Sequence, residues 1–204
     1  QFSYRGLWMD CELLEWLEAH TFPEESKFTD AAYAAEAYGY FADALKTSVT
    51  TRACIFATIH REAAEILMQL LDEAGIAAYV GKVNMDRNAP DSLTEQHSAE
   101  ETEQWLRETC GRYEAVKPIL TPRFVPSCSD ELLSALGDLQ KTYHVPVQSH
   151  LSENLSEIEW VKQLCPWSAY YGQVYDRFGL FGGEAKTIMA HCVYSSREEI
   201  DQMK

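Results

Sequence analysis

The spacing of apolar and polar positions changes near residue 46 of the chain. Before this point the apolar residues recur as they do in helices. Leu7–His20 is amphipathic, and Thr21–Glu24 is expected to end that helix. A second helix, capped by Thr29 or Asp30, is expected to run through Leu45. After residue 46, short runs of β-branched and small residues alternate with helical patterns, which indicates repeated strand–helix units.

Five segments in this later part have the composition of strands. The first is expected to be a buried strand, and two prolines make the third an awkward one. The five predicted strands are Val49–Thr58, Ile76–Asn84, Val116–Phe124, Val145–His150 and Lys186–Cys192.

Helical patterns follow these strands. In His60–Ala74 the apolar residues Ala63, Ile66, Leu67, Leu70 and Leu71 fall on one helix face, and Gly75 is expected to end the helix. Ser98 and Glu101 have capping-box spacing. The remaining predicted helices are Ser98–Cys110, Ser129–Tyr143, Glu153–Leu164 and one that begins at Ser195 with Glu198.

Consecutive strand–helix units predict an α/β fold with a parallel sheet covered by helices. An open doubly wound sheet and a closed barrel both fit this pattern. No GxGxxG and no GxxxxGK[ST] follows a predicted strand, so nucleotide-binding folds lose their main support. A (β/α)8 barrel needs eight units over about 250 residues. About five units in 204 residues fit a partial barrel, with residues 1–204 as the central portion of a single barrel domain.

Composition narrows the class of protein further. The formal net charge of −15 disfavours binding to nucleic acid. No stretch approaches the roughly 18 apolar residues of a membrane span. Six widely spaced cysteines without a CxxC pair indicate reduced thiols in a cytoplasmic protein. Because the chain opens with Gln1 and closes inside a helix-like run, we interpret it as an excerpt with both ends missing.

The ends of the predicted strands carry the candidate chemistry, because functional residues of barrels lie at the carboxyl ends of strands. Two imidazoles, a guanidinium, an aromatic ring and a carboxylate are expected to gather at one rim. This set suits metal-assisted hydrolysis of a planar substrate. Its members are His150, His191, Arg123, Phe124 and Glu153.

Each candidate has an ordinary structural alternative. A histidine at a strand end is often only hydrogen-bonded, and His60 is interpreted in that way. Arg123 could be an ion-pair partner and Phe124 a core residue. Glu153 would suit the N-terminus of the following helix electrostatically. Cys192 is expected to be a buried neighbour of the site, since a catalytic thiol needs a turn or a helix start to expose it.

Several of these segments resemble the guanine deaminases of the amidohydrolase superfamily. The resemblance runs in the same order over nearly the whole chain. It rests on Thr121–Phe124, Ser127–Ser129, Gln148–Asn154 and Met189–His191, with support from Gln1–Tyr4, Leu13–Leu17, Thr21–Pro23, Phe56–His60 and Val80–Val83.

The resemblance implies a (β/α)8 barrel that uses one zinc ion to hydrolyse guanine to xanthine and ammonia. His150 would be a zinc ligand, and Glu153 would shuttle protons between the zinc-bound water, a ring nitrogen and the leaving amine. His191 would orient the water rather than hold the metal. Arg123 would bind the purine edge, Phe124 would pack on the ring and Gln1 would bond the opposite edge.

The same resemblance places the remaining zinc ligands outside this segment. A His-x-His pair is expected before Gln1 and an aspartate after Lys204. His150 and Glu153 would also contact the substrate, and the family likeness suggests a homodimer.

Two other functions stay open at this point. One is a related amidohydrolase that deaminates another amino-heterocycle, such as a triazine, a pterin or an adenosine derivative. The other is a metal-free barrel that serves as a binding or assembly protein. The second class of zinc nucleobase deaminases is disfavoured, because neither H-x-E nor P-C-x-x-C occurs in the sequence.

Overall fold

A computed structural model describes residues 2–8, 10–182 and 186–204 of the chain. The chain forms two compact units, each of which is described by itself. The first unit comprises residues 1–83, 90–93 and 104–118, and the second comprises residues 84–89, 94–103 and 119–204. Strands pair in parallel in both units, so the predicted α/β fold class is confirmed.

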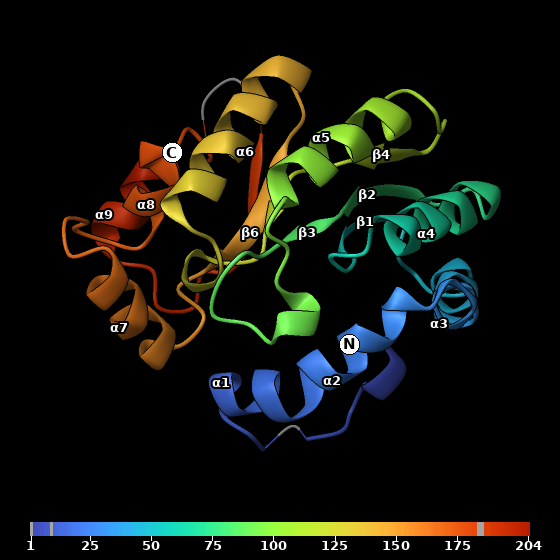
Figure 1. Cartoon of the computed structure of the whole chain (residues 1–204), viewed down its shortest axis with the longest axis horizontal. Helices are drawn as coiled ribbons and strands as arrows, with labels where there is room; N and C mark the ends of the chain where they lie inside the picture. Colours follow the sequence, from blue (N-terminus) through green and yellow to red (C-terminus); the bar gives the residue numbers. More distant parts are fainter. Residues whose placement is uncertain (1, 9, 183–185) are drawn as a thin grey trace. The chain divides into compact units, whose positions relative to one another are not determined.

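The first unit contains a three-stranded parallel sheet with the order β1-β2-β4. Arg52 of β1 lies opposite Ala77 of β2, and Ala78 lies opposite Val116 of β4. In Figure 1, β1 and β2 lie side by side with α4 next to them. The bounds of the strands are Arg52–Phe56 for β1, Ala77–Gly81 for β2 and Val116–Pro118 for β4.

Strand β1 is less buried than its sequence predicts. Its residues alternate between exposed and half-buried, and Val49, which was expected to begin the strand, is 99% exposed. Among the described strands only β2 pairs with β1, so one side of β1 has no neighbouring strand. The buried residues follow the strand at Ala57, Thr58 and Ile59.

Helices α3 (Ala31–Lys46) and α4 (Arg61–Glu73) pack against each other in the first unit. Asp30 caps α3, because its side chain accepts a hydrogen bond from the backbone N–H of Ala32. The buried face of α4 is shifted from the predicted one, with Ile66 and Leu70 only half-buried. Its buried residues are Ala63, Ala64, Leu67, Met68 and Leu71.

The predicted helix Leu7–His20 is wrong at both ends. Helix α1 begins at Leu13, continues through a π-helical stretch at Leu17–Thr21 and passes into α2 (Phe22–Glu25). Pro23 does not end the helix, because it lies in the first turn of α2, where a missing N–H costs little. The bounds of α1 are Leu13–Trp16, and 3-10 turns occupy Phe2–Tyr4 and Ser26–Thr29.

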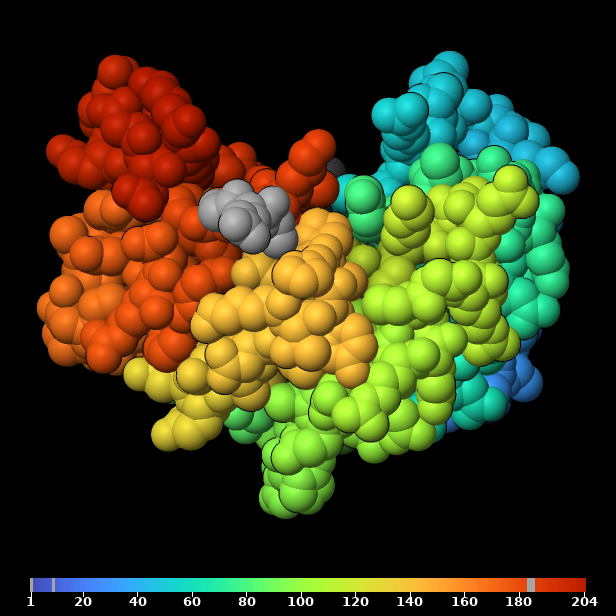
Figure 2. Space-filling model, turned by 90° about the horizontal axis from the view of Figure 1, so that it is seen from above, coloured from blue at the N-terminus to red at the C-terminus, as the bar shows by residue number. Residues whose placement is uncertain are grey.

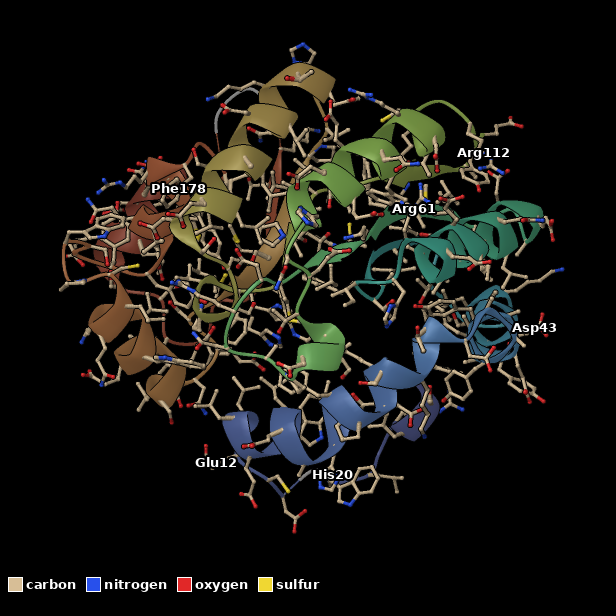
Figure 3. All side chains as sticks on the ribbon, in the orientation of Figure 1. Glu12, His20, Asp43, Arg61, Arg112 and Phe178 are labelled. Atoms are coloured by element: carbon tan, nitrogen blue, oxygen red, sulfur yellow. The ribbon has the colours of Figure 1, made fainter. Side chains whose placement is uncertain are left out.

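Salt bridges join α4 to the surface of the same unit. Arg61 lies 3.0 Å from Glu108, and Arg112 lies 3.5 Å from Glu65. Figure 3 labels Arg61 and Arg112. These ion pairs are partly exposed, so each is expected to contribute little to stability.

The second unit contains the parallel pair β6 (Val147–Leu151) and β7 (Thr187–His191). The register places Leu151 opposite His191, so both strands end at the same level. A bridge between Leu120 and Val147 extends the pairing on the other side of β6. The predicted strand Val116–Phe124 is divided into β4 and β5 (Thr121–Pro122), and β5 pairs with β3 (Val83–Asn84).

Strand order in the described sheets is compatible with one of the two expected sheet types. Within each sheet the neighbours follow their order along the chain, and no strand is inserted out of turn. A doubly wound sheet reverses its strand order at a switch point, whereas a barrel does not. The described strands therefore agree with a partial barrel.

Helices complete the second unit. Ser129 caps α6, and the outer side of this helix, golden in Figure 2, lies at the surface. Gly137 of α6 packs closely on the chain at Phe178, which Figure 3 labels, because a Cβ there would lie 2.0 Å from the Phe178 carbonyl oxygen. The helices are α6 (Asp130–Tyr143), α7 (Leu155–Leu164), α8 (Gly172–Arg177) and α9 (Arg197–Gln202), while α5 (Ser98–Thr109) is divided between the units.

Helix starts differ from two of the predicted ones. Helix α9 is capped by Ser196 rather than Ser195, since the Ser196 hydroxyl accepts the backbone N–H of Glu199. Ser98 is the first residue of α5 instead of its cap, and its hydroxyl accepts a hydrogen bond from the Asn84 amide at 2.9 Å. Among the described residues, no helix is both long and apolar enough to cross a membrane.

Candidate active site

His150 near the end of β6 has a fixed tautomer. Its Nδ1 lies 2.6 Å from the backbone carbonyl oxygen of Arg123. A carbonyl only accepts hydrogen bonds, so Nδ1 carries the proton and Nε2 carries the lone pair. Burial lowers the pKa of His150 from 6.5 to about 4, which keeps the imidazole neutral at pH 7. A neutral imidazole with a directed lone pair is the form that binds a metal ion.

His191 at the end of β7 lies beside His150 and Glu153. The two imidazole rings stack with centroids 5.4 Å apart. Nε2 of His191 lies 3.4 Å from Oε1 of Glu153, and the two side chains are 40% and 25% exposed. Burial lowers the pKa of His191 and raises the pKa of Glu153, an effect that the positive charge of Arg123 opposes at Glu153. Both shifts favour neutral forms, so a proton can pass to or from this pair at little cost.

The backbone is left-handed at three non-glycine residues around this pair. Ser152, His191 and Cys192 have φ values of 49°, 74° and 54°. Such conformations cost about 1–3 kcal/mol each and persist only where surrounding contacts hold them. Here the ladder continues beyond the strands, because Cys192 N donates to Leu151 O at 2.8 Å and Tyr194 N donates to Ser152 O at 2.9 Å.

Arg123 and Phe124 follow β5 in the same unit. Arg123 is 9% exposed, and its charge acts on both Glu153 and His150. Phe124 is buried, with its ring edge-to-face on Trp160 at a centroid distance of 6.2 Å. The structure therefore places His150, His191 and Arg123 near Glu153, and Phe124 directly follows Arg123 in the chain. Gln1, the fifth predicted binding residue, lies outside the described residues.

Glu153 does not belong to the following helix, contrary to the sequence prediction. Helix α7 begins at Leu155, Asn154 is its N-cap, and Glu157 completes a capping box with Asn154. The capping box of α7 is thus formed by Asn154 and Glu157, and Glu153 directly precedes the N-cap. Glu153 lies in the turn between β6 and α7, where its carboxylate is directed to His191 instead.

Behind this turn lies a buried polar network that the sequence analysis missed. Glu157 is fully buried and accepts hydrogen bonds from the Tyr171 hydroxyl at 2.8 Å and the Glu153 backbone N–H at 3.0 Å. The Tyr175 hydroxyl bonds to the Ser149 hydroxyl at 2.7 Å. The spacing Asn154-x-x-Glu157 is a readable capping-box signal, but nothing local reveals that Glu157 is buried.

Cys192 lies in a sharp turn, although the sequence analysis expected none. Its left-handed backbone would suit an exposed nucleophile, yet burial raises the pKa of the thiol. Sγ donates to the Met189 carbonyl at 3.6 Å. A thiol with a raised pKa is a poor nucleophile. Cys192 is half-buried rather than buried as predicted. His60 belongs to the first unit, where it is the N-cap residue of α4.

His150 is suited to bind a metal ion, but such an ion would need more ligands. The Nδ1–H bond to a backbone carbonyl is the second-shell contact typical of metal-bound histidines. Within residues 2–8, 10–182 and 186–204, no group of three or more His, Cys, Asp or Glu side chains is placed to hold a metal ion. A zinc site normally has three or four protein ligands, so His150 could supply only a part of one.

Comparison with known proteins assigns the family. The model of the amidohydrolase family matches residues 2–204. The chain belongs to the amidohydrolase family. This amidohydrolase chain is 45% identical over 203 residues to a guanine deaminase of Dictyostelium discoideum, covering 98% of the chain and 45% of that protein. It therefore spans somewhat less than half the length of this curated relative.

Solved structures agree with the family of this amidohydrolase. A guanine deaminase from C. acetobutylicum, with guanine bound in its active site, superposes with a TM-score of 0.96 at 51% identity, over 99% of this chain and 48% of that one. A zinc-bound adenosine deaminase from Xanthomonas campestris superposes with a TM-score of 0.76 at 18% identity, over 95% of this chain and 42% of that one. The latter likeness is one of fold.

Proposed function

We propose that this amidohydrolase chain is the central part of a barrel enzyme that hydrolyses guanine to xanthine and ammonia. The observation that carries the proposal is the Glu153–His191 pair at the ends of β6 and β7, beside a neutral His150. The resemblance to a guanine deaminase with guanine in its active site supports the choice of substrate. We further propose that residues 1–204 belong to a single barrel domain.

Proton transfer is the task of Glu153. Hydrolytic deamination requires a proton to be taken from the attacking water and a proton to be delivered to the leaving amine. A carboxylate with a raised pKa can do both in turn, because its two protonation states are closer in free energy near neutral pH. His191, 3.4 Å from Glu153, would orient the attacking water.

His150 would hold a zinc ion through Nε2, and the other ligands would come from outside this segment. When bound, zinc lowers the pKa of a coordinated water from about 15.7 to about 7. The low pKa of His150 supports this role, since a neutral imidazole binds metal at neutral pH without first losing a proton.

Substrate recognition would rest on Arg123 and Phe124. A guanidinium can hydrogen-bond the purine edge, and an aromatic ring can pack on its face. The 9% exposure of Arg123 means that its charge is largely shielded from water, which strengthens a bond to substrate. Gln1 is proposed to bond the opposite purine edge, and a homodimeric, cytoplasmic enzyme remains our expectation from family likeness and cysteine usage.

The experiment that tests this proposal uses the full-length protein with zinc restored after chelation. We expect guanine to be converted to xanthine with release of one ammonia per turnover, and we expect activity to disappear with the metal. Amino-substituted triazines, amino-substituted pterins and adenosine derivatives should be turned over far more slowly. Preferred turnover of one of those heterocycles would move the substrate to that class, and no turnover with bound zinc would favour a binding protein.

A further inference from the structure

The turn that carries Glu153 is held by a carboxylate that has no part in the proposed chemistry. Oε2 of Glu157 accepts the backbone N–H groups of Glu153 at 3.0 Å and of Asn154 at 3.3 Å. An ordinary capping box requires only the bond to the N-cap residue, which here is Asn154. The additional bond to Glu153 ties the capping residue directly to the proposed proton-transfer residue.

Burial distinguishes Glu157 from a typical capping glutamate. The residue is fully buried, although a carboxylate is costly to remove from water unless it is well hydrogen-bonded. Its second oxygen accepts the hydroxyl of Tyr171 at 2.8 Å, and Tyr171 itself is buried. Both oxygens of Glu157 are therefore fixed, and the carboxylate is a rigid support for the turn rather than a mobile surface group.

The residue before Glu153 is held from another helix. The hydroxyl of Ser152, whose φ is 49°, donates to Oε2 of Glu199 at 2.9 Å. Oε1 of Glu199 accepts the backbone N–H of Gly172 at 2.6 Å, and Glu199 is 1% exposed. Two buried carboxylates thus fix the turn on either side of Glu153, which explains how the left-handed conformation of Ser152 is maintained.

We propose that Glu157 is a positioning residue for the deamination, because it fixes the Glu153 backbone at the distance from His191 that proton transfer requires. This inference rests on the proposed function. Glu157 acts through hydrogen-bond geometry, so the reach of its side chain matters more than its charge. A misplacement of about 1 Å at a reacting group can cost up to about 100-fold in rate.

Two substitutions of Glu157 distinguish the effect of side-chain length from the effect of its charge. Glu157→Gln keeps the length of the side chain and an oxygen that can accept both backbone N–H groups, with its amide turned to the Tyr171 hydroxyl. Glu157→Asp keeps the charge but is one methylene shorter and cannot reach both the turn and Tyr171. We expect kcat to fall about 10- to 100-fold in Glu157→Asp and clearly less in Glu157→Gln. Zinc content and KM for guanine should stay close to those of the wild type.

A matched control and a second readout complete the test. Glu159→Asp changes a residue on the same helix whose side chain is 62% exposed, and it should leave kcat unchanged. Hydrogen–deuterium exchange should be faster in the peptide covering Ser152–Asn154 of Glu157→Asp, but not across the whole protein. This readout does not depend on activity.

A double-mutant cycle decides whether Glu157 works through Glu153. In a Glu153→Gln background, Glu157→Asp should cause little further loss of kcat, since the group that it positions no longer transfers protons. Equal losses in both backgrounds, a Glu157→Gln enzyme as slow as Glu157→Asp, or wild-type kcat and exchange in Glu157→Asp would each overturn the inference. Failure of the wild-type protein to deaminate guanine would instead overturn the proposed function, and the inference with it.

Discussion

Two connections in the molecule each lead from a parallel strand to a helix, but their residues differ in conformation and in hydrogen bonding. The connection from β1 to α4 carries Thr58 and His60, and the connection from β6, which contains His150, to α7 carries Glu153. In the first, polar groups serve the backbone: the Thr58 hydroxyl accepts the His60 backbone N–H at 3.0 Å, and Thr58 O accepts Val83 N at 2.9 Å. Residues 57–60, all described, have no positive φ.

The connection from β6 to α7 has several features that the first connection lacks. It holds a left-handed Ser152 and a carboxylate with a raised pKa, it follows a strand that carries a neutral histidine, and two buried glutamates support it. A fold does not require such features to join a strand to a helix, as the first connection demonstrates. The difference teaches that strain and buried charge, rather than the presence of a histidine at a strand end, distinguish the connection that we propose to be functional.

The largest expected effect is the loss of zinc affinity when His150 is replaced. His150→Ala should lower zinc affinity at least about 100-fold, since even outer-shell partners of metal ligands contribute 10- to 100-fold. Activity should fall in proportion to the loss of bound zinc, as measured by elemental analysis of the purified protein. His144→Asn is the control, because Asn tolerates the left-handed backbone of residue 144. Full zinc content in a folded His150→Ala protein would remove His150 from the metal site.

A smaller effect, on KM for guanine, is expected when Arg123 is replaced. It distinguishes a role of Arg123 in substrate binding from a role in a structural ion pair. Arg123→Ala should raise KM for guanine by roughly 10- to 100-fold, because a hydrogen bond to a charged group contributes about 1.5–3 kcal/mol. Zinc content should remain intact. A lowered melting temperature with a normal KM would instead make Arg123 a structural ion-pair residue, and measurement of both quantities on the same protein distinguishes the outcomes.

The smallest effect on catalysis is expected at His60, in the first connection. His60→Ala should reduce stability by about 1 kcal/mol, the typical loss for a point substitution. Its kcat and zinc content should stay close to those of the wild type, because its side chain makes no capping bond and the connection carries no strained residue. A large loss of kcat without loss of stability would show that both connections serve the reaction.

The sequence predicted the second connection in part. Strand-like composition and helical patterns located β6, β7 and α6 within a few residues, and the rule that barrel sites lie at strand ends selected His150 and His191. The N-terminal helices were predicted less well, because a π-helical stretch carries the chain into Pro23 without a break. The extent of β1 was overestimated, because composition alone does not mark where a strand begins and ends.

What the sequence could not predict depends on contacts between distant residues. The tautomer of His150 is set by the carbonyl of Arg123, 27 positions earlier, and the support of Ser152 comes from Glu199, 47 positions later. Glu157 has an ordinary capping-box spacing, and only the packing of Tyr171 over it makes it a buried support. Local patterns therefore locate a site, whereas its pKa values and its rigidity arise from tertiary contacts.

The pH dependence of the reaction tests the role of the Glu153 carboxylate. Burial raises the pKa of Glu153 above its ordinary 4.5, and the carboxylate form is the one that takes a proton from water. Activity should therefore fall as pH decreases through the raised pKa, so the acid limb of kcat/KM should lie above pH 4.5.

The measurement that tests the central claim most directly is kcat of the full-length, zinc-loaded Glu153→Gln protein. Glutamine keeps the shape and hydrogen-bonding reach of Glu153 but cannot cycle a proton. The variant should fold, bind zinc and bind guanine, yet turn over at least about 100-fold more slowly than the wild type. A zinc-loaded Glu153→Gln enzyme with near-normal kcat would contradict the account and leave His191 as the remaining group beside the site that could transfer the proton.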